Sequence, residues 1–178
     1  RQITVEEVLR DREDTLGLEN LSPEGDLSRP ITHPDPASPG LALAGFTERV
    51  VGGRVQVFGE TEMAYLDALD PKLFDERLRH LFRHDVPVVF VTKELDVEDH
   101  FLELAREHGI PVFRTNMGTG AFFQRLNPYL EAALAPTVSL HGSLADVYGV
   151  GLLFVGKSGI GKSECVLDLV ERGHPLVA

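Results

Sequence analysis

The sequence of 178 residues contains a single cysteine, Cys165. No disulfide can form within the chain, and no zinc site can be built on a set of thiolates. Long hydrophobic runs are also lacking, since no apolar stretch approaches the roughly 18 residues needed to span a bilayer. The first residues, RQITVEEVLRD, contain no apolar segment typical of a secretory signal. These absences predict a soluble, cytoplasmic protein.

Positive charge is scarce, because 17 lysines and arginines face 28 aspartates and glutamates, which gives a formal net charge of −11. Proteins that neutralise nucleic-acid phosphates need a basic surface, so this balance argues against DNA or RNA as the main partner. The composition, with 43% hydrophobic and 25% charged residues, is typical of globular domains. The length allows one large domain, or one domain and part of another.

Residues 1–135 alternate between strand-like and helix-like segments. Thr4 and Glu7 form a capping box at the start of the first helix, and the proline-rich residues 22–40 are typical of a loop. The apolar run 86–91, VPVVFV, predicts a strand covered on both faces. Further strands are expected at 54–58 and 110–113, and helices at 62–69, 72–84 and 122–135. This alternation predicts a small, mostly parallel α/β domain.

Two residues bear on where these helices begin and end. Asp96 is expected to cap the helix that Gly109 ends. Pro128 falls inside the helix expected over 122–135, where it marks either a break or a new start. The dipeptide Ala135-Pro136 marks the expected domain boundary.

Residues 136–178 have a different character. Closely spaced strands are expected at 137–140, 145–148 and 150–155, followed by a glycine-rich loop and a helix that ends near Arg172. Another strand is expected to begin at Leu176. The predicted fold class is therefore α/β, with an N-terminal α/β domain over 1–135 and the first strands, P-loop and helix of a P-loop kinase domain over 136–178.

The glycine-rich loop matches the P-loop pattern G-x-x-x-x-G-K-[ST] without a mismatch. Its residues are Gly156, Lys157, Ser158, Gly159, Ile160, Gly161, Lys162 and Ser163. Glycines let successive backbone N–H groups face one concavity that cradles a β-phosphate, and the following helix adds its positive N-terminal end. The pattern predicts that Lys162 reaches the β- and γ-phosphates of a nucleotide and that the Ser163 hydroxyl ligates Mg²⁺. We therefore predict binding of ATP and Mg²⁺.

Three residues in or near the loop allow two interpretations each. The charge of Lys157 is expected to be solvated, with an extra phosphate contact as the alternative. Cys165 is expected to be a small buried side chain rather than a reactive thiol. His141 is an ordinary loop histidine on spacing alone, although a histidine beside a phosphate site can stabilise transferring charge. Phosphoryl transfer also needs an acidic metal ligand and a proton acceptor, and no downstream strand-end carboxylate is present in the sequence.

The flanks of the P-loop resemble one particular family. The stretch HGSLADVYGVGLLFVGKSGIGKSECVLDLVERGHPLVA resembles the start of the catalytic domain of bacterial HPr kinase/phosphorylase. The segments PGLALAGF at 39–46 and RVQVFGETE at 54–62 resemble the N-terminal domain of that family, so the likeness spans nearly the whole chain. Ser38 and Pro175 stand where the family tends to have arginine.

The resemblance implies a Mg²⁺-dependent enzyme that uses ATP to phosphorylate a serine of HPr, a small phosphocarrier protein of the sugar phosphotransferase system, in the regulation of carbon metabolism. It also implies the reverse reaction, in which inorganic phosphate attacks the phosphoserine. It assigns catalytic roles to His141 and Lys162, nucleotide binding to residues 156–163, and the metal to Ser163. It further implies an aspartate pair after the LVA segment and a homohexameric assembly.

Two other classes of function stay open at this point. A P-loop alone is also found in phosphotransferases that act on small molecules and in nucleotide sensors. Residues 1–135 contain no set of side chains typical of catalysis, so the chain by itself could instead be a regulatory or assembly module.

Overall fold

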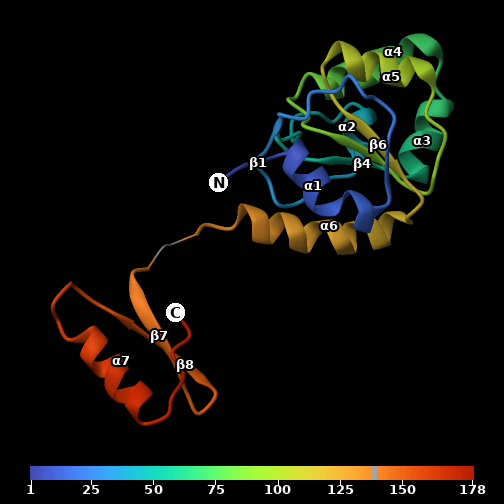
Figure 1. Ribbon diagram of the computed structural model, residues 1–178. Coiled ribbons are helices and arrows are strands. Elements are labelled where there is room, and N and C mark those ends of the chain that lie inside the picture. Colours follow the sequence, from blue (N-terminus) through green and yellow to red (C-terminus); the bar gives the residue numbers. More distant parts are fainter. Residues whose placement is uncertain (138–139) are drawn as a thin grey trace. The chain divides into compact units, whose positions relative to one another are not determined.

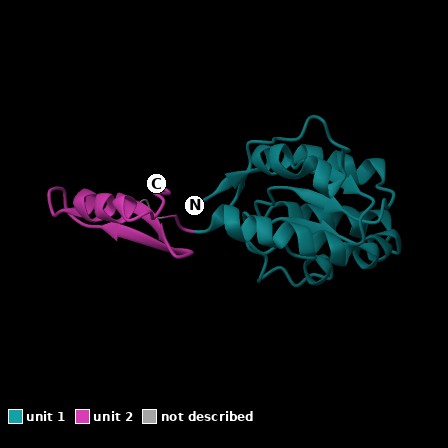
Figure 2. Cartoon of the chain, turned by 60° about the horizontal axis from the view of Figure 1, so that its bottom comes forward, with its two compact units in different colours: residues 1–135 teal, residues 136–178 magenta. Residues whose placement is uncertain are grey.

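The computed structural model describes residues 1–137 and 140–178. The chain divides into two compact units, Arg1–Ala135 and Pro136–Ala178 (Figure 2). Val138 and Ser139, which lie within the strand expected over 137–140, are outside the described residues.

The first unit is built on a four-stranded sheet in the order β2-β6-β5-β4. Strands β4, β5 and β6 are parallel to one another, whereas β2 runs antiparallel to β6. A separate antiparallel pair joins β1 and β3. The mixed, mostly parallel α/β fold expected from the sequence is confirmed. The strands are β1 (Ile3–Thr4), β2 (Leu18–Asn20), β3 (Pro30–Ile31), β4 (Gln56–Phe58), β5 (Val89–Val91) and β6 (Val112–Thr115).

Helices cover both faces of this sheet (Figure 1). One hydrophobic cluster packs α1 and α6 against one face, and a second cluster packs α3, α4 and α5 against the other. Within β5, Phe90 belongs to the first cluster, whereas Val89 and Val91 belong to the second, as the alternation of a strand requires. The helices are α1 (Val5–Leu16), α2 (Gly40–Leu43), α3 (Glu60–Asp67), α4 (Pro71–Phe82), α5 (Asp99–Glu107) and α6 (Thr119–Leu134).

The capping signals at the helix starts are confirmed at one position and wrong at another. Thr4 and Glu7 form the expected capping box, in which the Glu7 N–H donates to Thr4 Oγ1 over 3.2 Å and the Thr4 N–H donates to Glu7 Oε2 over 2.8 Å. Asp96 does not cap α5, because the helix begins three residues later, after Glu98 as its N-cap. The Asp96 carboxylate lies instead 3.8 Å from the guanidinium of Arg114.

Pro128 does not break α6, which continues from Thr119 to Leu134. A proline inside a helix removes the N–H that would bond to the carbonyl four residues earlier, here that of Gln124. Both residues are exposed, so water can bond to the freed carbonyl. The helix is held by its buried stripe of Phe122, Leu126 and Leu130, which packs on the sheet.

The second unit contains an antiparallel hairpin and one helix. Strands β7 (Gly142–Val147) and β8 (Val150–Val155) pair in register from Gly142 opposite Val155 to Val147 opposite Val150. Tyr148 and Gly149 form the two-residue turn, both with positive φ, as this turn type requires. Helix α7 (Lys162–Glu171) follows β8. Leu176 then pairs antiparallel with Ala145, at the start of the strand expected there.

No helix among the residues described, 1–137 and 140–178, combines the length and apolar character required to cross a membrane.

Phe90 offers a test of the packing in the first unit. Its ring is fully buried and lies 5.1 Å from the ring of Phe122 and 5.9 Å from that of Phe113, measured between centroids. We expect Phe90→Ala to lower the free energy of unfolding of this unit by about 3–5 kcal/mol, because a large buried ring leaves a cavity. Denaturant unfolding measures the loss, and a change below about 1 kcal/mol would contradict this packing.

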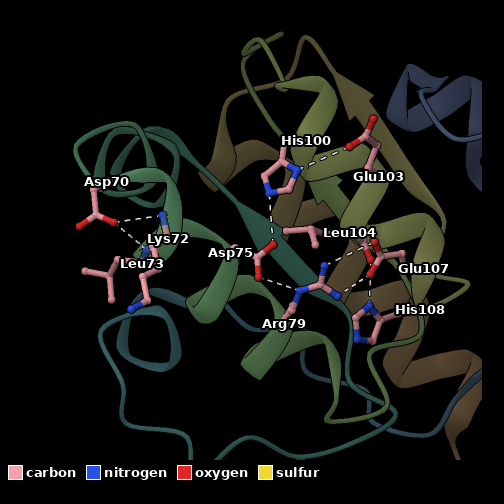
Figure 3. Close-up of polar contacts among 10 residues, drawn as sticks. All are labelled: Asp70, Lys72, Leu73, Asp75, Arg79, His100, Glu103, Leu104, Glu107 and His108. Atoms are coloured by element: carbon pink, nitrogen blue, oxygen red, sulfur yellow. Dashed lines mark hydrogen bonds and ion pairs between the residues drawn. The ribbon is translucent and has the colours of Figure 1, made fainter.

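Polar contacts join α4 to α5 on the surface of the first unit (Figure 3). Arg79 Nε donates to Asp75 Oδ2 over 2.7 Å, and the same guanidinium bonds to the Glu107 carboxylate. These hydrogen bonds from Arg79 lower the pKa of Asp75 and of Glu107 below their ordinary values. His100 Nε2 lies 3.3 Å from the other oxygen of Asp75.

Carboxylates with lowered pKa values stabilise the folded state above their ordinary pKa of about 4, and this contribution is lost as the pH falls through the lower, folded pKa. We therefore expect Arg79→Met to reduce the acid sensitivity of the first unit. Its stability deficit relative to the wild type should be present at pH 6 and shrink well below pH 4. Denaturation midpoints across this range measure it, with Arg83→Met, at the C-cap of the same helix, as the control. A deficit that does not change with pH would contradict the expectation.

Candidate nucleotide-binding site

The P-loop sequence lies between a strand and a helix, the context in which such loops act. Strand β8 ends at Val155, the loop occupies residues 156–161, and α7 begins at Lys162. The hairpin with β7 fixes the direction in which β8 enters the loop. The loop is neither extended nor helical over these residues.

Glycine is required at two positions of the loop. Gly159 has a φ of 81° and Gly161 a φ of 94°, in the left-handed region that side chains disfavour. Gly161 is also the N-cap of α7 and turns the chain into the helix without a side-chain cap.

The loop backbone is rich in free donors. The N–H groups of residues 157–164 donate no hydrogen bond to any residue within the described part of the chain. The next N–H, that of Cys165, bonds to the Gly161 carbonyl over 3.0 Å and begins the helical ladder. Free N–H groups at a helix start, together with the helix dipole, form a site where an anion is favoured. A phosphate group is therefore the ligand that this backbone suits.

Lys162 folds back along the loop from the first turn of α7. Its Nζ donates to the carbonyl of Gly156 over 2.6 Å and to that of Lys157 over 2.8 Å. The ammonium group therefore lies against the beginning of the loop, on the same stretch as the free N–H groups. The Lys157 side chain is exposed, in agreement with the prediction that its charge is solvated.

The hairpin register brings His141 to the same end of the unit as the loop. His141 directly precedes Gly142, which pairs with Val155, and Val155 directly precedes Gly156. The exposed imidazole is thus carried beside the strand that feeds the P-loop. Sequence spacing could not show this proximity, because 14 intervening residues separate His141 from Gly156 along the chain.

The remaining residues of the first turn of α7 face outward. Ser163 and Glu164 are exposed, so the Ser163 hydroxyl is accessible to a metal ion. The prediction that Cys165 is buried is wrong, since its side chain is exposed. Helix α7 turns Val166 inward instead, and the neighbouring position therefore points away from the hairpin.

The fold and this loop define the class as an α/β chain that carries a P-loop sequence. Residues 3–130 match the family model described as "HPr Serine kinase N terminus", and residues 132–178 match "HPr Serine kinase C-terminal domain". The chain belongs to the HPr serine kinase family.

Curated relatives carry the name HPr kinase/phosphorylase. Those from Bacillus cereus (strain B4264), Bacillus mycoides (strain KBAB4) and Bacillus anthracis (strain A0248) are each 43% identical over 169 residues. Each match covers 95% of this chain and 55% of the relative, so the chain spans about half the length of these proteins.

Among solved structures, the CBS and DRTGG domains of the regulatory region of Clostridium perfringens pyrophosphatase, complexed with the activator diadenosine tetraphosphate, are similar with a TM-score of 0.49 and 17% identity. The match covers 75% of this chain and 52% of that one. At that TM-score the likeness supports no inference about function.

Gly161 offers a test of the loop geometry. We expect Gly161→Val to weaken ATP binding by the full-length gene product about tenfold or more, because a β-branched residue at this φ costs about 1–3 kcal/mol. Gly151→Val in β8 is the matched control, since its φ is not positive and an added Cβ meets only Leu144 Cδ1, at 3.6 Å. Calorimetric titration measures both affinities. Equal affinities for the two variants would contradict the assigned role of Gly161.

Proposed function

We propose that the protein to which this chain belongs is an ATP-dependent serine kinase and phosphorylase that acts on the phosphocarrier protein HPr. The observation that carries the proposal is the glycine loop between β8 and α7, with free N–H groups over residues 157–164 and the Lys162 ammonium folded against its start. The family membership and the names of the curated relatives supply the acceptor and the reaction. The chain then contributes an N-terminal domain, residues 1–135, and the beginning of the kinase domain, residues 136–178.

In this proposal the P-loop residues bind the phosphates of ATP. The backbone N–H groups of residues 157–163 donate to phosphate oxygens, and α7 adds the positive end of its dipole. Lys162 exchanges its two carbonyl acceptors for the β- and γ-phosphates, which places an ammonium group where charge develops during transfer. Because those carbonyls are neutral, a polyphosphate is the stronger acceptor.

Ser163 and His141 complete the part of the site that this chain supplies. Ser163 lies in the first turn of α7 with an exposed hydroxyl, which suits a hard cation such as Mg²⁺. When bound, Mg²⁺ supplies charge neutralisation on the transferring phosphoryl group. His141, carried to the P-loop end of the hairpin by the β7–β8 register, is assigned to stabilise the transferring charge.

The partners follow from the same proposal. They are HPr, ATP and inorganic phosphate, in a homohexamer that acts in the cytoplasm. The net charge of −11 argues against DNA or RNA as a main partner. No observation favours the alternatives of a small-molecule phosphotransferase, a nucleotide sensor or a purely regulatory module.

The proposal is tested with the full-length gene product, HPr, ATP labelled at the γ-phosphate, and Mg²⁺. We expect label to appear on a seryl side chain of HPr, and inorganic phosphate to remove it again. Absence of transfer to HPr would reject the kinase assignment, and transfer to a small acceptor alone would replace HPr as the substrate.

Lys162→Ala tests the residue whose ammonium group lies against the start of the loop. We expect the transfer rate to fall at least about 10²-fold, because the ammonium group is lost where negative charge develops. Lys157→Ala is the matched control: its side chain is exposed in the same loop, and only its backbone carbonyl contacts Lys162. Near wild-type turnover by Lys162→Ala, or an equal loss in both variants, would count against the role of Lys162.

A further inference from the structure

The first unit contains a pocket that the kinase reaction does not use. It has a volume of about 640 Å³ and is lined only by residues between Ala37 and Gln56. This volume falls within the range of about 300–1,000 Å³ typical of sites for small molecules. Its lining residues come from α2, its flanking segments and the start of β4. Both elements are labelled in Figure 1, and β4 is the edge strand of the sheet. Four of the eight residues of the segment 39–46, to which the proposed reaction assigns no role, line the pocket.

Apolar side chains form the wall of the pocket and are left open to solvent. Leu41 is 74% exposed, Phe46 73% and Val51 40%. All three line the same cavity, although each belongs to a residue type that is normally buried. This wall suits a ligand with an apolar or aromatic body, because covering it removes apolar surface from water.

A buried amide adds a polar group to the pocket. Gln56 lines the pocket and is only 3% exposed. Its Nε2 donates to the carbonyl of Arg54 over 3.1 Å, whereas its Oε1 accepts no hydrogen bond from any residue that the structure describes. The Oε1 atom is therefore open to a hydrogen bond from a ligand that carries a donor.

The charged residues of the pocket favour an anion. Arg49 and Arg54 line it together with one carboxylate, that of Glu48. Among the described residues, neither arginine forms an ion pair, and the only side-chain hydrogen bond of the two is from Arg54 Nε to the Asp35 carbonyl. In a chain with a net charge of −11, this local excess of positive charge selects for a negative group.

We propose that this pocket is a binding site for a small organic anion, in which a carboxylate or phosphate group is attached to an apolar or aromatic body. The anionic group binds at Arg49 and Arg54, the body covers Leu41 and Phe46, and a donor of the ligand bonds to Gln56 Oε1. The site lies wholly within the first unit, so it is independent of the P-loop and of the proposed kinase activity.

Three related probes test the site on the whole chain: 2-naphthoate, 2-naphthyl phosphate and the neutral 2-naphthylmethanol. Backbone amide shifts are followed by NMR. We expect saturable shifts within residues 37–56 for at least one anion, and weaker binding of the alcohol. The tighter of the two anions identifies the preferred head group. The proposal is overturned if shifts fall only outside residues 37–56, or if the alcohol binds as tightly as both anions.

Arg49→Gln removes one cation from an exposed position, so the variant is expected to fold. It should weaken binding of the preferred anion about tenfold or more, as expected for loss of a charge-assisted contact, and leave the alcohol unchanged. Arg83→Gln, an exposed arginine outside the pocket, is the matched control and should bind like the wild type. Phe46→Ala should weaken all three probes alike. Unchanged anion affinity in Arg49→Gln would overturn the proposal.

Discussion

Burial of strand β5 on both faces is the constraint around which residues 1–135 are built. All three of its residues are fully buried, with Phe90 on one side and Val89 and Val91 on the other. A parallel strand without a polar face needs a layer of helices on each side. Helices α1 and α6 supply one layer, and α3, α4 and α5 supply the other.

Because helices cover both faces of the sheet, the pocket lies at its edge. Beyond β4, the segment around Ala37 pairs with Gln56, and α2 with the following loop lies beside it. These residues do not lie between two layers of helices. Apolar side chains such as Phe46 are therefore exposed, and the amide of Gln56 lines a cavity. The pocket thus follows from the edge position of β4.

In the second unit, the groups suited to binding an anion belong mostly to the backbone, and the part of the unit that the structure describes has no large core. Among its described residues, only Ala145 and Val166 are buried apolar residues. Its hairpin and helix hold a loop that Gly159 and Gly161 turn through positive φ, and the N–H groups of residues 157–164 donate to no carbonyl of the described residues. A bound anion can accept hydrogen bonds from several of these N–H groups at once. No side chain of the described residues accepts one from them.

The sequence by itself determined the features that depend on residues close together in the chain. The Thr4–Glu7 capping box, the apolar run of β5 and the order of strand, glycine loop and helix at residues 150–171 were all predicted, because each depends on the pattern of neighbouring residues in the chain. Local sequence did not set the limits of two helices. Helix α6 stays continuous through Pro128, and α5 begins at Asp99, beyond Asp96.

Only the tertiary structure decided what distant or differently oriented residues do together. The exposure of Cys165 depends on which side of α7 meets the hairpin, and the placement of His141 beside the P-loop depends on the β7–β8 register. The contacts of Arg79 with Glu107 and the convergence of Arg49, Arg54 and Gln56 on one cavity likewise have no periodic signal in the sequence. A contact across the fold depends on how the elements pack, which no local propensity specifies.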